Sequence, residues 1–294
     1  MRVIFLGTPE FAVPTLNAVA REHEIVRVIA QPDKPSGRGM QMHAPAVAVR
    51  AKELSLALLQ PAKIREAIDE LSTLNADIGI VIAYGKILPA SLLAIPKHGF
   101  VNVHASLLPK YRGAAPIQRA IENGEIETGV TIMRVDEELD HGAMLDVAKL
   151  AIGADEHSPS LSQRLSQLGA ETLLHSLRNL SPGTPQDHSQ ATYAPKIEKQ
   201  EGLVNWNEPA KKIYDKYRAF DPWPGVFTAD GIKLFDVSLS DERGDAGKVL
   251  RIDHDVVIAC GENSLRIETM QRPGKSRAPA GDVARGLGWV SPRA

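Results

Sequence analysis

The sequence predicts an α/β protein, with a mostly parallel sheet in its first part and a small domain of antiparallel strands behind it. Short apolar runs rich in Val and Ile, at residues 2–7 and 77–83, have the composition of strands buried on both faces. Leucines at helical spacing over residues 158–179 indicate an amphipathic helix that closes this first domain. From residue 232 on, the chain alternates as short strands between Gly and Asp turns, which favours a small β-barrel.

Composition and charge are those of a globular protein. The 294 residues suffice for one large domain or two of ordinary size, and 43% are hydrophobic and 24% charged. No apolar run is long enough to span a bilayer and no targeting segment precedes the first strand, so we expect a cytoplasmic protein without a membrane partner. The single Cys260 excludes an intrachain disulfide and a cysteine-cluster metal site. With a net charge of −2, a nucleic-acid site would have to be a local basic patch.

The first sixty residues open as a strand–turn–helix unit. Residues 2–7 read as a buried strand, Thr8 is a candidate N-cap, and Pro9 suits the first position of a helix that runs to about Arg21. This start is Rossmann-like, but Gly7 is the only glycine in the turn, so the dinucleotide fingerprint is absent. We therefore predict neither a nicotinamide nor a flavin cofactor, and we predict no metal.

Further elements follow from the same patterns. We expect strands at residues 24–31, 56–60, 77–83, 100–104, 129–135 and 144–152, and helices at residues 44–54, 64–74, from about 117 and 158–179. Residues 32–43, rich in Pro, Gly and charge, read as an exposed, mobile loop.

The Pro- and Gly-rich composition of residues 181–204 predicts a linker between two domains, which we place at 1–180 and 205–294. The second domain begins with a helix over residues 210–220. We expect its strands at residues 232–237, 249–253, 256–260 and 265–270, as an OB-like barrel.

Residues 100–116 are the strongest candidate for an active site. Side chains alternate along a strand, so Asn102 and His104 share one face while Val101 and Val103 share the other. The two polar residues fall at the carboxyl end of the strand, where open α/β sheets place their ligands. By themselves, an Asn and a His near a strand end are more often structural than functional.

The run that follows, Ser106-Leu107-Leu108-Pro109, resembles a signature of the folate-dependent formyltransferases, which move a formyl group from 10-formyltetrahydrofolate to an amine. In that family an Asn and a His on one strand, with a later Asp, surround the reacting carbon. The resemblance implies Asn102, His104 and Asp140 as catalytic residues, the last from a Leu-Asp-x-Gly pattern. It also implies 10-formyltetrahydrofolate as donor, held by Ser106, Leu107, Leu108, Pro109, Tyr84 and Gly85.

Without the family resemblance, two of these donor-binding assignments have other interpretations. For Tyr84 and Gly85 an ordinary strand-to-helix turn is an equal interpretation. Ser106 has no sequence feature that pairs it with an activating base, so we expect it to shape its loop and not to act as a nucleophile.

Other stretches resemble the methionyl-tRNA branch of this family, and together they cover essentially the whole chain. The Pro-Asp-Lys-Pro and Gly-Arg-Gly elements of residues 32–39 resemble a loop inserted to contact the tRNA acceptor end, although Met40 and Gln41 replace the lysines that often follow. Residues 192–196, 218–224 and 271–275 match in the second half. The implied tRNA-binding residues are Lys34, Arg38, Lys196, Arg272, Lys275 and Arg277. Four further cations have helical spacing, and phosphate contacts and a solvated face are equal interpretations of them: Lys211, Lys212, Lys216 and Arg218.

The chemistry of the implied catalytic residues suits formyl transfer to an amine. Asn102 offers an N–H donor to the developing oxyanion, His104 can donate to that oxygen or to the leaving nitrogen, and Asp140 can accept the amine proton. The resemblance predicts transfer to the methionine of initiator methionyl-tRNA, for translation initiation, by a monomer. The alternatives are an N-formyltransferase for a nucleotide-linked amino sugar, a glycinamide ribonucleotide formyltransferase, and a catalytically silent RNA-binding protein.

Overall fold

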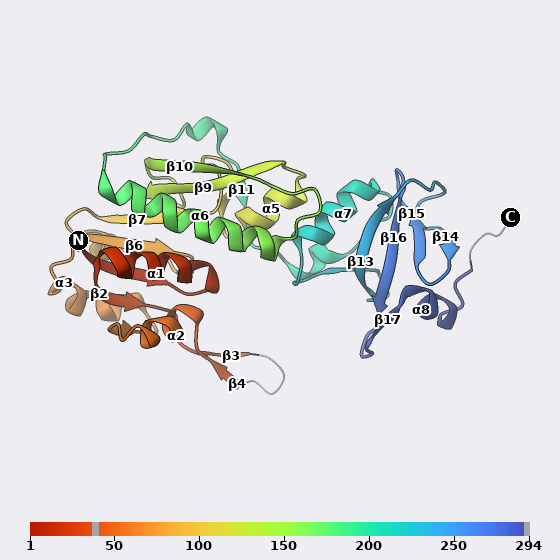
Figure 1. The fold of residues 1–294 in the computed structure, drawn as a ribbon, viewed down its shortest axis with the longest axis horizontal. Coiled ribbons are helices and arrows are strands. Elements are labelled where there is room, and N and C mark those ends of the chain that lie inside the picture. The colour runs from red at the N-terminus through yellow and green to blue at the C-terminus, as the bar shows by residue number, and fades with distance from the viewer. Residues whose placement is uncertain (37–40, 291–294) are drawn as a thin grey trace. The chain divides into compact units, whose positions relative to one another are not determined.

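The computed structural model describes residues 1–36 and 41–290. The chain divides into two compact units (Figure 1). The N-terminal unit takes in Met1–Pro116, Glu127–Ala151 and Leu161–Ala194, and the C-terminal unit takes in Ile117–Ile126, Ile152–Ser160 and the chain from Pro195 on. Each unit is described by itself.

The N-terminal unit is built on a seven-stranded sheet. In spatial order its strands are β10 (Met144–Ala151), β9 (Glu127–Arg134), β7 (Phe100–His104), β6 (Ile78–Ile82), β1 (Arg2–Gly7), β2 (Glu24–Ile29) and β5 (Leu58–Leu59). The five strands from β7 to β5 pair in parallel, and β9 is antiparallel to both β7 and β10. The prediction of a mostly parallel α/β sheet is confirmed.

Alternating side chains of this sheet fill two apolar layers. Val3 and Phe5 of β1 pack against α1 (Val13–Glu22), α2 (Ala46–Glu53) and α6 (Ser158–Arg178), and Figure 1 shows α1 and α6 crossing one face of the sheet. Ile4 and Leu6 pack on the opposite face, against the 3-10 helix η2 (Ile64–Ala67), α3 (Ile68–Ser72) and α4 (Ala90–Leu93). Apolar side chains on both faces of the strands explain their unbroken Val and Ile runs.

The strand order reverses beside β1. From β1 the chain builds outward through β2 to β5, and then returns to place β6 and β7 on the other side of β1. Such a reversal leaves a crevice at the carboxyl ends of the two strands that flank it, and open α/β sheets bind their ligands there. The residues that follow β1 and β6 therefore lie at the edge where β7 also ends.

Two local predictions about the N-terminal unit are wrong, and one short helix was not predicted. Thr8 does not cap a helix: a 3-10 turn, η1 (Glu10–Ala12), precedes α1, and the Thr8 hydroxyl donates instead to the Tyr84 carbonyl at 3.1 Å. Residues 34–36 and 41–43 are not plain loop, because they form the antiparallel strands β3 (Lys34–Ser36) and β4 (Gln41–His43). The short helix α4 has no counterpart in the prediction.

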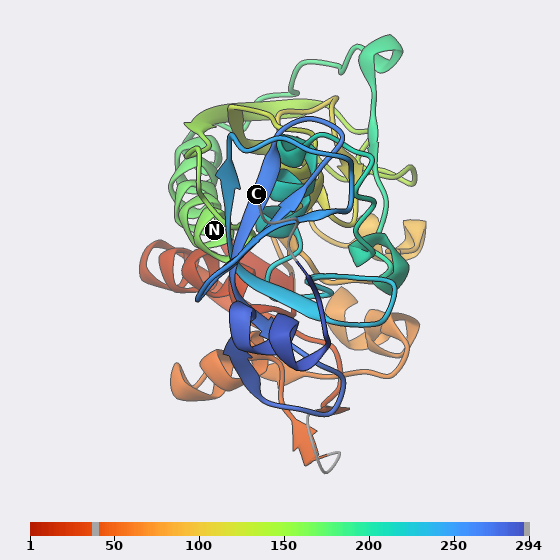
Figure 2. The ribbon, with the colours of Figure 1, turned by 90° about the vertical axis from the view of Figure 1, so that its right-hand side faces the viewer.

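The C-terminal unit is an antiparallel sheet with helices. Along the sheet the strands are β12 (Val226–Phe227), β13 (Lys233–Ser240), β16 (Ser264–Gln271), β15 (Val256–Ala259) and β14 (Val249–Ile252), and β17 (Arg277–Pro279) also pairs with β16. Figure 2 views these strands from the side of this unit. The core also includes residues of α7 (Ala210–Ala219) and α8 (Ala280–Gly286). The antiparallel β domain is confirmed, whereas α8 is an addition to the prediction.

Two further findings bear on the exclusions made from the sequence. The buried Cys260 lies in the core of the C-terminal unit, and this burial raises its pKa to about 11, so its thiol has little reactive character. Among the described helices, none combines the length and apolar character needed to cross a membrane.

The segment predicted as a linker forms contacts within both units. Residues 181–194 belong to the N-terminal unit, where β11 (Tyr193–Ala194) pairs in parallel with β8 (Arg112–Gly113). The 3-10 helix η3 (His188–Gln190) precedes β11, and the 3-10 helix η4 (Lys199–Gly202) follows it in the C-terminal unit. The domain boundaries at 180 and 205 stay a prediction.

Candidate active site

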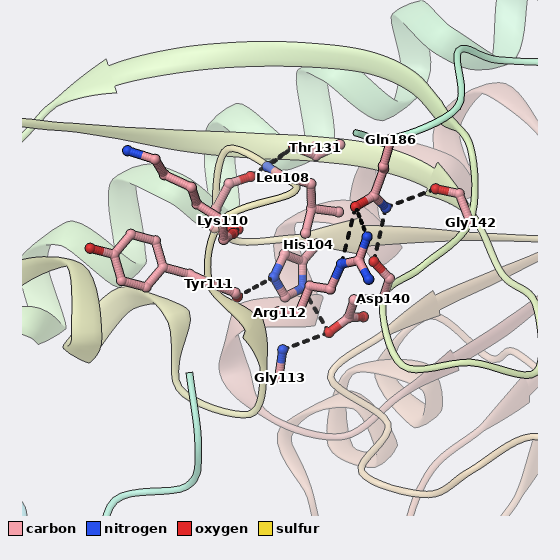
Figure 3. Close-up of polar contacts among 11 residues, drawn as sticks. His104, Leu108, Lys110, Tyr111, Arg112, Gly113, Thr131, Asp140, Gly142 and Gln186 are labelled. Atoms are coloured by element: carbon pink, nitrogen blue, oxygen red, sulfur yellow. Dashed lines mark hydrogen bonds and ion pairs between the residues drawn. The ribbon is translucent and has the colours of Figure 1, made fainter. Parts of the chain in front are cut away.

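His104, the last residue of β7, is held between two oxygen atoms (Figure 3). Its Nε2 lies 2.9 Å from the Tyr111 carbonyl oxygen and its Nδ1 lies 3.6 Å from Oδ2 of Asp140. A carbonyl oxygen only accepts, so Nε2 carries a proton and donates it. The second nitrogen, Nδ1, faces the Asp140 carboxylate. The side chain is only 5% exposed, so this orientation is enforced by packing.

Asp140 comes from the loop between β9 and β10. Its Oδ2 accepts a hydrogen bond from the backbone N–H of Gly113 at 2.8 Å, and its side chain is 13% exposed. Gly113 is required by its surroundings: its φ is +120°, and a Cβ there would lie 2.7 Å from the Ala194 carbonyl oxygen. The close approach of β11 thus fixes the amide that holds Asp140.

Asn102 lies on the same face of β7 as His104, as the alternation predicts. It is half-buried, whereas its neighbours Val101 and Val103 are buried in the apolar layer on the other face. Within the described part of the chain its side chain has no hydrogen-bond partner. A half-buried amide without a partner, beside a His–Asp pair, is available to a ligand.

The loop after β7 is shaped by buried hydroxyl groups. The Ser106 hydroxyl donates to the Lys110 carbonyl oxygen at 2.6 Å. Thr131 of β9 donates to the Ser106 carbonyl oxygen at 2.8 Å and accepts from the Leu108 N–H at 3.1 Å. The Ser106 hydroxyl is therefore committed to the turn, which fits the loop-shaping role expected of it. The turn includes a cis peptide between Leu108 and Pro109.

Leu107 of this loop packs closely on β9. A Cβ at Gly129 would lie 2.5 Å from its Cδ2 atom and 2.1 Å from the Ala148 carbonyl oxygen, and this backbone oxygen is what requires a glycine.

The parallel strands β1 and β6 end at the same edge of the sheet as β7. Tyr84 is 2% exposed and its ring packs in the apolar layer with Leu88 and Leu92, and burial raises the pKa of its hydroxyl. The ring is thus part of the core, and the Tyr84 carbonyl oxygen accepts from the Thr8 hydroxyl at the sheet edge. Gly85 has a φ of +79° and nothing within 4 Å of the place where a Cβ would stand. Space beside this glycine is open.

Two buried residues absent from the sequence-based site contact it. Arg112 and Gln186 are each 4% exposed, and the guanidinium donates to the Gln186 side-chain oxygen at 2.7 Å. Gln186 in turn donates to the Asp140 carbonyl oxygen at 2.9 Å. Sequence reasoning missed Gln186 because it stands in a Pro- and Gly-rich stretch without periodicity, and no motif marks it.

The predicted tRNA-binding residues are exposed where the structure describes them. Lys34 stands on β3 in the N-terminal unit, and Lys196 follows β11 in the C-terminal unit. The turn between β16 and β17 brings together Arg272, Lys275 and Arg277. The Arg277 guanidinium lies 3.6 Å from the centre of the Phe235 ring, a cation–π contact. Arg38 lies outside the described residues.

The cations of α7 are paired with carboxylates. Lys211 contacts Asp215 at 2.6 Å, and Lys212 contacts Glu208 at 2.5 Å. Arg218 is buried and also pairs with Asp215, while Lys216 is 3.7 Å from Glu208. Because nearby carboxylates neutralise these four charges, the pairing favours a structural role for the α7 cations over phosphate binding.

Comparison with known proteins identifies the class. A family model described as formyl transferase matches residues 1–177, and one described as formyl transferase, C-terminal domain, matches residues 196–288. The chain therefore belongs to the formyl transferase family, whose members transfer a formyl group.

Relatives that share one activity align with nearly the whole chain. A methionyl-tRNA formyltransferase of Geobacter sulfurreducens is 44% identical over 298 residues, which cover 98% of this chain and 94% of the relative. The enzyme of that name from Deinococcus radiodurans is 44% identical, with 97% and 92% covered. The resemblance to methionyl-tRNA formyltransferases predicted from the sequence is confirmed.

Solved structures share the fold at lower identity. HypX from Aquifex aeolicus, in complex with tetrahydrofolic acid, has a TM-score of 0.64 at 22% identity, covering 98% of this chain and 47% of that one. This chain thus spans about half the length of HypX. An N-formyltransferase from Helicobacter canadensis, in complex with folinic acid and dTDP-3-aminofucose, has a TM-score of 0.71 at 18% identity, with 90% and 97% covered. At these identities the likeness is one of fold alone.

The geometry at Gly113 generates a first prediction. Gly113→Ala would bring a methyl group to 2.7 Å from the Ala194 carbonyl oxygen and displace the N–H that holds Asp140. We expect the rate of formyl transfer to fall by roughly tenfold or more, because small displacements of a reacting group are costly. Gly99→Ala is the matched control, since Gly99 also has a positive φ but has nothing within 4 Å of an added Cβ. Equal rates for the two variants would contradict the assignment.

Proposed function

We propose that this protein transfers a formyl group from 10-formyltetrahydrofolate to the amino group of methionine on initiator methionyl-tRNA. One observation carries the proposal: His104 stands 3.6 Å from Asp140, beside the unpartnered amide of Asn102, at a strand end. Relatives at about 44% identity over almost the whole chain, all named methionyl-tRNA formyltransferases, support the choice of acceptor.

The residues present fit a folate donor. The Asn102 amide is without a partner among the described side chains, and open space adjoins Gly85 at the strand-order reversal. A donor bound there supplies an activated formyl group on a nitrogen atom. We assign its contacts to the loop residues Ser106, Leu107, Leu108 and Pro109 and to the backbone of Tyr84 and Gly85.

The oxygen of the reacting formyl group becomes negative as the amine attacks its carbon. A side-chain N–H of Asn102 donates to that oxygen, and the amide does so without a charge that must first be desolvated. Because the Asn102 side chain has no other partner in the described structure, it need not break an existing bond to serve. Asn102 is therefore the oxyanion donor in this proposal.

Two proton transfers complete the reaction. Asp140 accepts a proton from the attacking amine, and His104 gives one to the nitrogen that leaves the formyl carbon. Since Nε2 of His104 already donates to the Tyr111 carbonyl, the proton delivered is the one on Nδ1. Nδ1 is also the nitrogen that faces Asp140. One proton transfer from the Asp140 carboxyl group to Nδ1 therefore returns both side chains to their starting protonation. A carbon–nitrogen bond forms and one breaks, and the net proton passes from amine to leaving nitrogen.

Exposed cations supply the tRNA contacts. Lys34, Lys196, Arg272, Lys275 and Arg277 are exposed, and none of them has a carboxylate partner within the described ranges. With Arg38, they are our candidates for contacts to phosphate groups, which position a nucleic acid without reading its sequence. The predicted monomeric state and cytoplasmic location stay predictions.

The choice of acceptor is tested directly. We expect formyl transfer to initiator methionyl-tRNA to exceed transfer to elongator methionyl-tRNA by at least about a hundredfold, the discrimination that a few lost polar contacts provide, and free methionine to be inert. The measurement is the initial rate with radiolabelled acceptors and a nucleotide-linked amino sugar in parallel. Transfer to the amino sugar alone would leave the folate chemistry standing and remove the tRNA proposal.

The catalytic roles are tested by substitution. Asn102→Ala, His104→Ala and Asp140→Ala should each lower the single-turnover rate by roughly 100- to 1,000-fold, the usual loss when one oxyanion donor is removed. Donor affinity, measured by fluorescence titration with a non-transferable folate, should change little. Val147→Ala is the control, because Val147 is exposed on β10 and its replacement should leave the rate unchanged. A near-wild-type rate for any of the three would remove that residue from the chemistry.

The turn between β16 and β17 is tested by charge reversal. Replacing Arg272, Lys275 and Arg277 by Glu should weaken tRNA binding and lower the slope of log K against log salt by about 0.9 for each lost duplex phosphate contact. Arg243→Glu with Lys248→Glu is the control, because both side chains are exposed cations elsewhere in the C-terminal unit. An unchanged affinity and slope at 50 and 200 mM salt would discard the assignment.

A further inference from the structure

The segment after α6 places a fully bonded glutamine against the catalytic loops. Gln186 donates through Nε2 to the carbonyl oxygens of Asp140, at 2.9 Å, and Gly142, at 2.8 Å. Its Oε1 accepts from Arg112, from Nη2 at 2.7 Å and from Nε at 3.2 Å. Both donors and both acceptor sites of the amide are thus used, and Figure 3 shows the amide between the two loops. The orientation of this side chain is fixed.

Arg112 is a buried cation whose partners are neutral. Besides Gln186 it donates to Nδ1 of His188 at 2.8 Å, and no carboxylate pairs with it among the residues that the structure describes. Burying a charge without an opposite charge is costly, so the guanidinium depends on these two acceptors for its stability. Arg112 directly precedes Gly113, whose N–H binds the Asp140 carboxylate.

The loop that carries Asp140 has an uncommon backbone conformation. Asp140 has a φ of +48°, which is unfavourable for a residue other than glycine. At Gly142 a Cβ would lie 2.0 Å from the Arg134 carbonyl oxygen, so this residue must be glycine. Bonds within the loop, such as the 2.8 Å contact of His141 Nδ1 with Asp136, are supplemented by contacts from other segments. Gln186 binds the carbonyls on either side of His141 and so supplies them.

Strand register shows why the loop needs such support. In the β7–β9 ladder His104 pairs with Thr131, and Val101 pairs with Arg134. The chain thus leaves β9 near the start of β7, and it must turn back to bring Asp140 to His104 at the other end. The side-chain bonds of Gln186 hold the returning part of the loop.

We propose that Gln186, anchored by Arg112, is a positioning residue that sets the Asp140 carboxylate relative to His104. This inference rests on the proposed catalytic role of Asp140. Gln186 touches no reacting atom. It acts on Asp140 through the hydrogen bond to the Asp140 backbone carbonyl. Residues 181–194 therefore contribute to the active site as well as connecting the two units.

The test replaces Gln186 by Glu. This change keeps an acceptor for Arg112 but removes the N–H donors, so the two loop carbonyls face a carboxylate. We expect kcat to fall by roughly ten- to a hundredfold, since a misplacement of about 1 Å costs on that order, with the KM for donor and for methionyl-tRNA within about threefold of wild type. Gln190→Glu is the matched control: Gln190 is exposed in the same segment and donates to Asp187, not to the loop.

A second comparison separates positioning from a merely structural effect. In an Asp140→Ala background, measured by single turnover with excess enzyme, Gln186→Glu should cause no further loss, because no carboxylate remains to be positioned. Equal losses in both backgrounds would overturn the inference, and so would a wild-type kcat or a change confined to KM. Thermal unfolding of each variant establishes that it is folded.

Arg112→Lys is the second variant, for the case in which Gln186→Glu does not fold. It keeps the positive charge but loses the fork that orients the Gln186 amide, so kcat should fall and the loss should again vanish without Asp140. If Asp140→Ala itself leaves the rate unchanged, the proposed function of Asp140 fails and the inference fails with it. If Asp140→Ala is slow while the Gln186 and Arg112 variants are not, only the inference fails.

Discussion

The hydrogen bond from the Gly113 N–H to the Asp140 carboxylate is the contact on which the site depends. It joins the loop after β7 to the loop after β9, and so brings His104 and Asp140 within 3.6 Å. Neither loop forms it alone. The Gly113 amide is placed by the pairing of β8 with β11, and the Asp140 backbone is held by Gln186. Three separate segments of chain therefore meet in one interaction.

The sheet explains where this contact lies. Parallel strands β1, β6 and β7 end at a common edge, and the strand order reverses beside β1. A crevice for a ligand follows from that topology in any protein that has it. What is particular to this chain is the antiparallel strand β9 beside β7, because it makes the following loop turn back toward the strand end that carries His104. A parallel neighbour would have ended at that edge without such a loop.

The cations of the C-terminal unit form two groups: those of α7 are paired with carboxylates, and those near the β16–β17 turn are exposed. The cations of α7, Arg218 among them, stand next to carboxylates and stabilise the C-terminal unit locally. Those of the turn between β16 and β17 are exposed and are the ones free to release counterions on binding a polyanion. A chain with a net charge of −2 can thus present a local cationic surface. The sequence shows the number of charges but not which of them are already paired.

Much of the fold was predictable because it depends on local patterns. Runs such as residues 2–7 and 77–83 are apolar on both sides, and only a strand covered on both faces satisfies that. The leucine spacing of α6 likewise specifies one face. Predictions failed where a side chain took a distant partner. Thr8 has the composition of a helix cap, yet its hydroxyl donates to Tyr84, 76 residues away. Short elements such as α4 and α8 are stabilised by packing more than by their own sequence.

The same division holds for the site. Alternation along residues 100–104 by itself determined that Asn102 and His104 share a face and stand at a strand end, and a short motif placed Asp140 beside them. Only the tertiary structure decided how Asp140 reaches His104. The amide of Gly113, the guanidinium of Arg112 and the side chain of Gln186 are far apart in sequence from the aspartate they hold, at separations from 27 to 46 residues. Local patterns record which residues can do chemistry, whereas long-range hydrogen bonds decide which of them meet.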